Sequence, residues 1–144
     1  MGDKVIERRV CQRFSIPGAT VSYRKEGLFA SKARSEEEFC PILDLSRGGV
    51  RFLTQKPLKF KSRVIVQLSV PGERVPLDIR GRVRWSTFNA GKSYKYQAGV
   101  QFSPYGFEKG QNVPQTLTRI VALETKFVEL TEPAGPSESG GPGA

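Results

Sequence analysis

The sequence has no histidine, and only two cysteines, one methionine and one tryptophan occur among its 144 residues. Without histidine, nucleophilic catalysis by a serine–histidine or cysteine–histidine pair is excluded in its usual form. The two cysteines, Cys11 and Cys40, lie far apart and form no CxxC pair, so they do not suit a zinc site. No Gly-rich phosphate loop of the P-loop or dinucleotide type occurs either. We therefore expect a protein that is not an enzyme and that holds no metal and no cofactor.

Long apolar runs are also missing from the chain. No stretch of about 18 apolar residues is present, so no membrane-spanning helix is expected. The N-terminus, Met1-Gly2-Asp3-Lys4, does not lead into the apolar region of a signal peptide. These absences predict a cytoplasmic protein whose thiols stay reduced and which does not insert into a membrane.

Positive charge is what the chain has in excess. It carries 23 Lys and Arg against 14 Asp and Glu, a formal net charge of +9. Such a balance favours an anionic partner, which could be a nucleotide, a nucleic acid or a membrane surface. A soluble surface that is basic without having an anionic partner would give the same total charge. Only the arrangement of the charges can distinguish these two possibilities. The length is that of one ordinary domain.

Alternation of apolar and polar residues predicts six β-strands. The expected strands are residues 19–23, 40–44, 50–54, 63–70, 75–85 and 95–102. In the fifth strand, the alternation places Val83 and Trp85 on one face. Between the first two strands, residues 24–38 are polar and read as a loop, with Glu36–Glu38 as a solvated acidic patch. Hairpin-linked strands favour an antiparallel sheet, and closure into a small barrel removes its edges.

A helical period follows the last strand. It predicts an amphipathic helix of three to four turns that begins near Asn112, with Pro114 in its first turn. Its apolar side chains are expected to cover one end of the barrel: Leu117, Ile120, Val121, Phe127 and Val128. The predicted fold is therefore mainly β, a six-stranded antiparallel β-barrel with a C-terminal α-helix. We expect residues 1–13 to form a flexible basic arm, residues 14–130 the barrel with its helix, and residues 131–144 a disordered tail.

The N-terminal arm contains three arginines in six residues, Arg8, Arg9 and Arg13. An arginine fork can pair with the O6 and N7 acceptors of a guanine or with two phosphate oxygens. Its flat face can also stack on a base. Arg9 and Arg13 could present two such forks to one compact ligand. A solvated basic tail would have the same composition, so this pattern alone leaves both readings open.

A second candidate site is the turn that contains Asp44, Ser46, Gly48 and Gly49. We expect this turn to connect the strands 40–44 and 50–54 through three to five residues. The two glycines supply backbone freedom and permit a ligand to approach closely. Asp44 can accept hydrogen bonds from the N1 and N2 groups of guanine, and Ser46 can bind a phosphate or a base. The alternative is a turn in which Asp44 and Ser46 only cap their own backbone. This pattern too leaves both readings open when it is taken alone.

Taken together and in this order, the two patterns resemble the PilZ domain family. Arg9 and Arg13 match an Arg-x-x-x-Arg arm, and Asp44, Ser46 and Gly49 match an Asp-x-Ser-x-x-Gly turn. Later segments, Gly81-Arg82-Val83-Arg84-Trp85 and Gly99-Val100-Gln101-Phe102, look like the late strands of that family. The resemblance runs from about Glu7 to Phe102.

The resemblance implies a small six-stranded barrel, followed by a helix, that binds the bacterial second messenger cyclic di-GMP. It implies that Arg9 and Arg13 contact guanine and phosphate, and that the turn with Asp44 contacts a guanine from the barrel side. It makes Arg8 a further ligand contact if two stacked ligand molecules bind. Trp85 matches an aromatic residue beside the ligand, although a core position is equally compatible with its strand.

The resemblance also implies a signalling role. The arm would order over cyclic di-GMP, and the new surface would transmit the level of the messenger to motility, biofilm or virulence machinery. The expected partners are cyclic di-GMP and an unidentified downstream protein. We expect no DNA or RNA partner and a monomeric protein.

Two alternatives stay open at this point. One is a single-stranded nucleic-acid binder, in which Arg80, Arg82 and Arg84 join Tyr94 and Tyr96 in a basic aromatic platform. A row of arginines with period two is also what the solvated face of a half-buried strand contains. The other alternative is a PilZ-like interaction module that contacts proteins and does not bind nucleotide.

Overall fold

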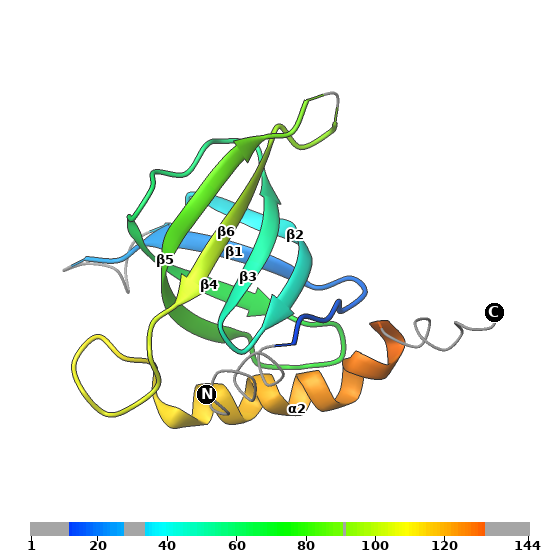
Figure 1. The fold of residues 1–144 in the computed structure, drawn as a ribbon, viewed down its shortest axis with the longest axis vertical. Coiled ribbons are helices and arrows are strands. Elements are labelled where there is room, and N and C mark those ends of the chain that lie inside the picture. The colour runs from blue at the N-terminus through cyan, green and yellow to red at the C-terminus, as the bar shows by residue number, and fades with distance from the viewer. Residues whose placement is uncertain (1–11, 28–33, 91, 132–144) are drawn as a thin grey trace, which may run out of the picture.

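The computed structural model describes residues 12–27, 34–90 and 92–131. This part of the chain folds into six strands and one helix (Figure 1). The elements are β1 (Thr20–Lys25), β2 (Glu37–Ser46), β3 (Gly49–Thr54), β4 (Arg63–Ser69), β5 (Leu77–Phe88), β6 (Tyr96–Phe102) and α2 (Pro114–Thr131). The mainly β class and the six predicted strands are thereby confirmed.

The six strands close into a barrel in the order β1-β2-β3-β6-β5-β4. Every neighbouring pair is antiparallel. Closure leaves no strand edge unpaired, which is how a small sheet of short strands avoids pairing with other chains. No helix in the described part of the chain is long and apolar enough to cross a membrane.

Alternate side chains of the strands fill the barrel. Phe52, Val66, Ile79 and Val83 are almost completely buried in one core cluster. Thr54 is also fully buried, and its hydroxyl donates to the carbonyl of Lys56 (2.7 Å). The core therefore follows from the period-two pattern that predicted the strands.

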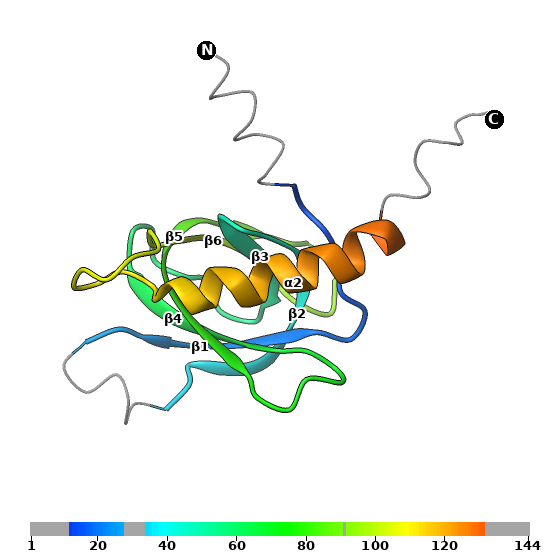
Figure 2. The ribbon, with the colours of Figure 1, turned by 90° about the horizontal axis from the view of Figure 1, so that it is seen from below.

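Helix α2 lies across one end of the barrel (Figures 1 and 2). Ile120 and Leu123 belong to the buried core cluster, and Phe127 and Val128 pack against it. The predicted position of the helix over a barrel end is thus confirmed. The helix begins at Pro114, two residues after Asn112, and its 18 residues exceed the expected three to four turns. The sequence pattern did not single out Leu123, which belongs with Ile120 to the buried core cluster.

The expected acidic loop is partly wrong. Strand β2 already begins at Glu37, and the carboxylate of this residue accepts a hydrogen bond from the buried hydroxyl of Tyr23 (2.6 Å). It also accepts the backbone N–H groups of Gln55 (2.8 Å) and Lys56 (3.2 Å) just after β3. Glu37 therefore ties three strands together instead of forming part of a solvated patch.

The expected face of Trp85 is wrong as well. A β-bulge between Val83 and Trp85 shifts the register of β5 against β6. Val83 is fully buried in the barrel, whereas Trp85 pairs with Gly99 on the outer face. One extra residue in the strand reverses the side on which the following side chains lie.

Candidate functional site

The β2–β3 hairpin carries the Asp-x-Ser-x-x-Gly turn. Ser46 pairs directly with Gly49, so only Arg47 and Gly48 connect the strands. The expected connection of three to five residues was therefore too long. In the register that this turn sets, Asp44 lies opposite Arg51 on the outer face.

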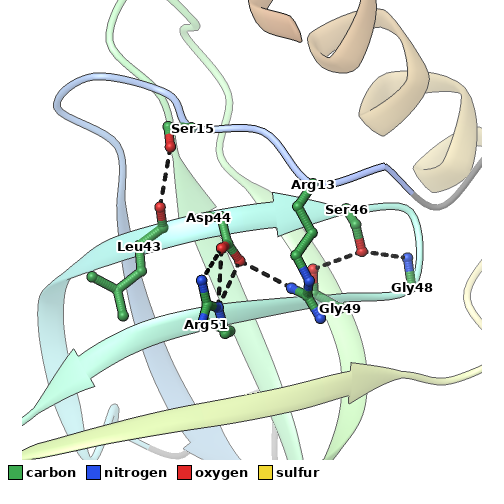
Figure 3. Close-up of polar contacts among 8 residues, drawn as sticks. All are labelled: Arg13, Ser15, Leu43, Asp44, Ser46, Gly48, Gly49 and Arg51. Carbon is green, nitrogen blue, oxygen red and sulfur yellow. Dashed lines mark hydrogen bonds and ion pairs between the residues drawn. The ribbon is translucent and has the colours of Figure 1, made fainter. Parts of the chain in front are cut away.

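Two arginines converge on the carboxylate of Asp44 (Figure 3). Arg51 Nε lies 3.0 Å from both carboxylate oxygens, and its Nη2 also donates to Oδ2. Arg13 Nη1 donates to Oδ1 at 2.9 Å. The hydrogen bond to Asp44 raises the pKa of the Arg51 guanidinium, against the opposing effect of burial. The carboxylate is only 12% exposed, so two cations hold one nearly buried anion.

The residue after Arg13 anchors it beside this carboxylate. Phe14 is completely buried and forms an isolated β-bridge with Leu45, in which the two backbone N–H···O distances are 2.9 and 2.8 Å. Ser15 Oγ donates to the carbonyl of Leu43 (3.2 Å). The chain is thus fixed to β2 on the C-terminal side of Arg13, and the Arg13 side chain remains 53% exposed.

Ser46 and the two glycines build the end of the hairpin. The Ser46 hydroxyl accepts the N–H of Gly48 (3.1 Å) and lies 3.5 Å from the carbonyl of Gly49, to which it donates. This is the backbone-capping role considered above, and the buried Ser46 fills it. Neither glycine has a positive φ. Gly49 is required because a Cβ there would overlap the carbonyl oxygen of Val100 on β6.

A row of outward-facing residues extends from Asp44 to Trp85. It crosses four neighbouring strands through Asp44, Arg51, Gly99 and Trp85. A Cβ on Gly99 would overlap the indole ring of Trp85, so the ring lies directly on this glycine. Trp85 therefore forms part of the outer wall and not of the core.

A shallow cavity of about 260 Å³ lies along this row. Its polar and aromatic lining includes Arg13, Arg51, Arg84, Trp85 and Gln101. Arg84 donates a hydrogen bond to the side-chain carbonyl of Gln101. Three guanidinium groups and an indole thus surround an open space beside one carboxylate. Such a surface can pair with phosphate or a guanine edge and can stack on a flat ring.

The structure brings most of the expected site residues to one outer face: Arg13, Asp44, Ser46, Gly48, Gly49 and Trp85. Arg8 and Arg9 lie outside the described residues. The sequence analysis did not assign Arg51, Arg84 or Gln101 to this site. The sequence did contain a signal for Arg51, because a two-residue turn between Ser46 and Gly49 places Arg51 opposite Asp44.

Two members of the basic aromatic platform considered above, Tyr96 and Arg82, are level with opposite ends of β6. Tyr96 pairs with Phe88 and Thr54 at one end of β6, whereas Arg82 pairs with Gln101 near the other end. Tyr96 and Gln101 are five residues apart on the strand, which corresponds to about 16 Å at the rise of a β-strand. The ring of Tyr96 packs edge-on against Phe88. The ring of Tyr96 therefore lies away from the guanidinium group of Arg82.

Nothing in the described ranges groups three or more His, Cys, Asp or Glu side chains around a potential metal ion. The site chemistry consists of cations, one carboxylate, amide groups and an indole. It is suited to binding an anionic ligand with flat rings.

The sequence and the fold were both compared with those of known proteins. A family model described as the PilZ domain matches residues 7–121. Among solved structures, the chain is similar to "MrkH, A novel c-di-GMP dependence transcription regulatory factor", with a TM-score of 0.53 and 18% identity. That match covers 79% of this chain and 48% of the other. At this identity the likeness shows a shared fold.

A second solved structure is the inhibitor of motility MotI/DgrA of Bacillus subtilis, with a TM-score of 0.48 and 18% identity. It covers 80% of this chain and 51% of the other. The chain therefore spans about half the length of the two structures. No curated protein matches the sequence.

Proposed function

Because the chain belongs to the PilZ domain family, we propose that it is a non-catalytic receptor for cyclic di-GMP. The observation that carries the proposal is the convergence of Arg13 and Arg51 on Asp44, beside the exposed face of Trp85. Arg13 and Asp44 occupy positions of the two sequence patterns that suggested this ligand. One solved structure with the same fold is described as a c-di-GMP-dependent transcription regulatory factor, and this description supports the same ligand class.

Each chemical part of the ligand has a counterpart in the site. The two guanidinium groups suit phosphate oxygens or the O6 and N7 edge of guanine. The carboxylate of Asp44 suits the N1 and N2 donors on the opposite edge. Trp85 offers an aromatic face against which a guanine can stack. The ion cluster already holds these groups close together, which lowers the cost of ordering them when the ligand binds.

The N-terminal arm completes the site in this proposal. The cavity of about 260 Å³ is smaller than the roughly 300–1,000 Å³ typical of small-molecule pockets, so the barrel wall alone covers only part of a ligand. Arg9 would add a second fork next to Arg13, and Arg8 would contact a second, stacked ligand molecule. The arm orders over the ligand, and the new surface is the signal.

We further propose that this surface engages a downstream protein that controls motility, biofilm formation or virulence. The receptor would act as a cytoplasmic monomer, with cyclic di-GMP as its ligand and no other cofactor. The neighbour with the same fold is described as a transcription regulatory factor, which agrees with an output through another macromolecule.

Calorimetric titration with cyclic di-GMP tests the proposal. Removing one charge-assisted contact costs about 2 kcal/mol, so Arg13→Ala should weaken binding by roughly 30-fold. Asp44→Ala should weaken it at least as much, because the change also leaves the two arginines without their shared anion. Lys95→Ala is the control, since it removes one charge on the β5–β6 connection, away from the site.

The variants should keep the parent circular dichroism spectrum, because none of them alters the barrel core. If Arg13→Ala and Asp44→Ala bind like the parent protein, or if the parent does not bind, the proposed function is wrong.

A further inference from the structure

A second cavity in the described part of the chain lies outside the site of Arg13 and Asp44. It has a volume of about 570 Å³, within the range of small-molecule pockets. Its walls are the outer faces of β4 and β5, the end of β6 and the connection that leads to α2. The residues that matter for its chemistry are Arg63, Arg80, Arg82, Lys109 and Glu26.

The charges in this cavity are unbalanced. Four cationic side chains line it, against the single carboxylate of Glu26. Glu26 already forms an ion pair with Arg80 (3.2 Å). Within the described ranges, no ion pair neutralises Arg63, Arg82 or Lys109. The cavity therefore has positive charge that the protein itself does not compensate.

Two of these arginines face each other across neighbouring strands. Arg63 on β4 is the direct partner of Arg82 on β5, and both side chains are exposed. Like charges directly opposite each other destabilise an antiparallel pair. A doubly or singly charged phosphate between the two forks would replace this repulsion with charge-assisted hydrogen bonds.

The wall formed by residues 103–112 is held in place by its own contacts. The Asn112 side chain donates to the carbonyls of Arg80 (3.1 Å) and Ser103 (3.0 Å) and accepts the N–H of Arg80 (2.8 Å). Gln111 Oε1 accepts the N–H of Glu108 (3.1 Å). These bonds fix the segment that carries Lys109 against β5, so the cavity is formed without a ligand.

From this geometry we propose that the cavity is a second binding site, specific for a phosphate-bearing small molecule. It adjoins the first site through Gln101, which lines both cavities. It differs from a nucleic-acid groove, because its only aromatic lining residue, Phe102, is buried and offers no stacking face. The phosphate could come from a further cyclic dinucleotide or from a different phosphorylated metabolite.

NMR titration of ¹⁵N-labelled protein in about 150 mM salt tests this site, since diffuse surface attraction is weakened there. Inorganic pyrophosphate, GMP and cyclic di-GMP are the three probes. We expect at least one of them to shift the backbone amides of Ser103, Gly110 and Gln111 in a saturable way. The double variant Arg63→Ala/Lys109→Ala should weaken that binding by about tenfold or more. Lys92→Ala/Lys95→Ala, with the same loss of charge, should change it less than about twofold.

The Arg13→Ala variant separates this proposal from the first one. In that variant, cyclic di-GMP shifts at the second site identify the messenger as a ligand there. Shifts with pyrophosphate or GMP alone identify another phosphate compound, and either result supports the site whether or not the first site binds. The proposal is overturned if no probe shifts these amides, or if the control double variant weakens binding as much as the site variant.

Discussion

Asp44 is the residue around which the proposed ligand site is organised. Its carboxylate holds Arg13 from the N-terminal segment and Arg51 from β3 at hydrogen-bond distance. A ligand that offers N–H donors to Asp44 and phosphate oxygens to the arginines exchanges these partners without stranding any charge. The protein therefore holds these charged groups in place by an ion cluster whose partners such a ligand would replace.

The fluorescence of Trp85 provides a direct test of whether a ligand binds beside this residue. Trp85 is the only tryptophan of the chain, and its ring lies on Gly99 in the wall of the cavity beside Asp44. A guanine stacked on the indole should change its emission, so cyclic di-GMP should quench the fluorescence of the parent protein with the affinity seen by calorimetry.

The variant Gly99→Ala sharpens that test. Its added Cβ would overlap the indole ring, so the ring must leave its present seat. We expect weaker quenching and weaker binding, with a barrel that still unfolds cooperatively. Phe88→Ala, at the exposed last residue of β5 and outside the lining of the cavity, is the matched control and should titrate like the parent. Unchanged emission on ligand addition, with binding proven by calorimetry, would place the ligand away from Trp85.

At the level of secondary-structure elements, the β2–β3 hairpin is coupled to the C-terminal helix. Arg47, between Ser46 and Gly48 in the turn, forms an ion pair with Glu124 of α2 (2.7 Å), and Glu124 is only 12% exposed. The carbonyl of Arg47 accepts the hydroxyl of Tyr105 (2.6 Å). One residue of the ligand motif thus connects the turn to the elements that close the barrel end.

A double-mutant cycle can measure this connection. We expect Arg47→Ala and Glu124→Ala to show a coupling energy of about 1 kcal/mol in urea unfolding, because the pair is largely shielded from water. The pair of Arg119 with Glu73 is the control. Both of its side chains are 38% exposed at a separation of 4.0 Å, so its coupling should stay within about 0.3 kcal/mol. Equal coupling in the two pairs would contradict a specific link between turn and helix.

The strands and the helix could be predicted because their periods are regular, whereas the details of the site depend on single-residue register. The bulge after Val83 moves Trp85 from the core to the outer wall, and period alone does not reveal such an insertion. The two-residue turn fixes Arg51 opposite Asp44, but the sequence Ser46-Arg47-Gly48-Gly49 is also compatible with a longer connection. Glu37 lies in an acidic run, and its partners are distant in sequence, so its role could not be foreseen.

For the whole molecule, two buried acidic groups, the hydroxyl of Tyr23 and the thiol of Cys40, predict a loss of stability at alkaline pH. Burial, with the adjacent Glu37, raises the pKa of the Tyr23 hydroxyl far above its ordinary value of 10.0. Burial and the charge of Glu37 also raise the pKa of the Cys40 thiol from 9.0 to about 12. Above the ordinary pKa values, the folded state retains protons that the unfolded state releases.

The sign of the effect follows from this difference in bound protons. The stabilising contribution is fully present below about pH 9, and the free energy of unfolding falls as the pH rises from about 9 toward the folded pKa values. Urea unfolding at a series of pH values measures the slope. Tyr23→Phe and Cys40→Ala should each flatten it. A parent slope that neither variant flattens would contradict this origin.

The barrel surface as a whole has a positive side that extends beyond one site. The first cavity contains Arg13, Arg51 and Arg84, and the second contains Arg63, Arg80, Arg82 and Lys109. Gln101 lies between them. Part of the excess positive charge is thus concentrated around two neighbouring cavities.

The most direct test of the central claim is an NMR titration of the ¹⁵N-labelled protein with cyclic di-GMP. We predict saturable shifts at the amides of Arg13, of residues 44–51 and of Gly99, together with the indole N–H of Trp85. These signals report the ion cluster, the turn and the aromatic wall in one experiment. The absence of shifts, or shifts confined to residues remote from these segments, would contradict the proposal that this face of the barrel binds cyclic di-GMP.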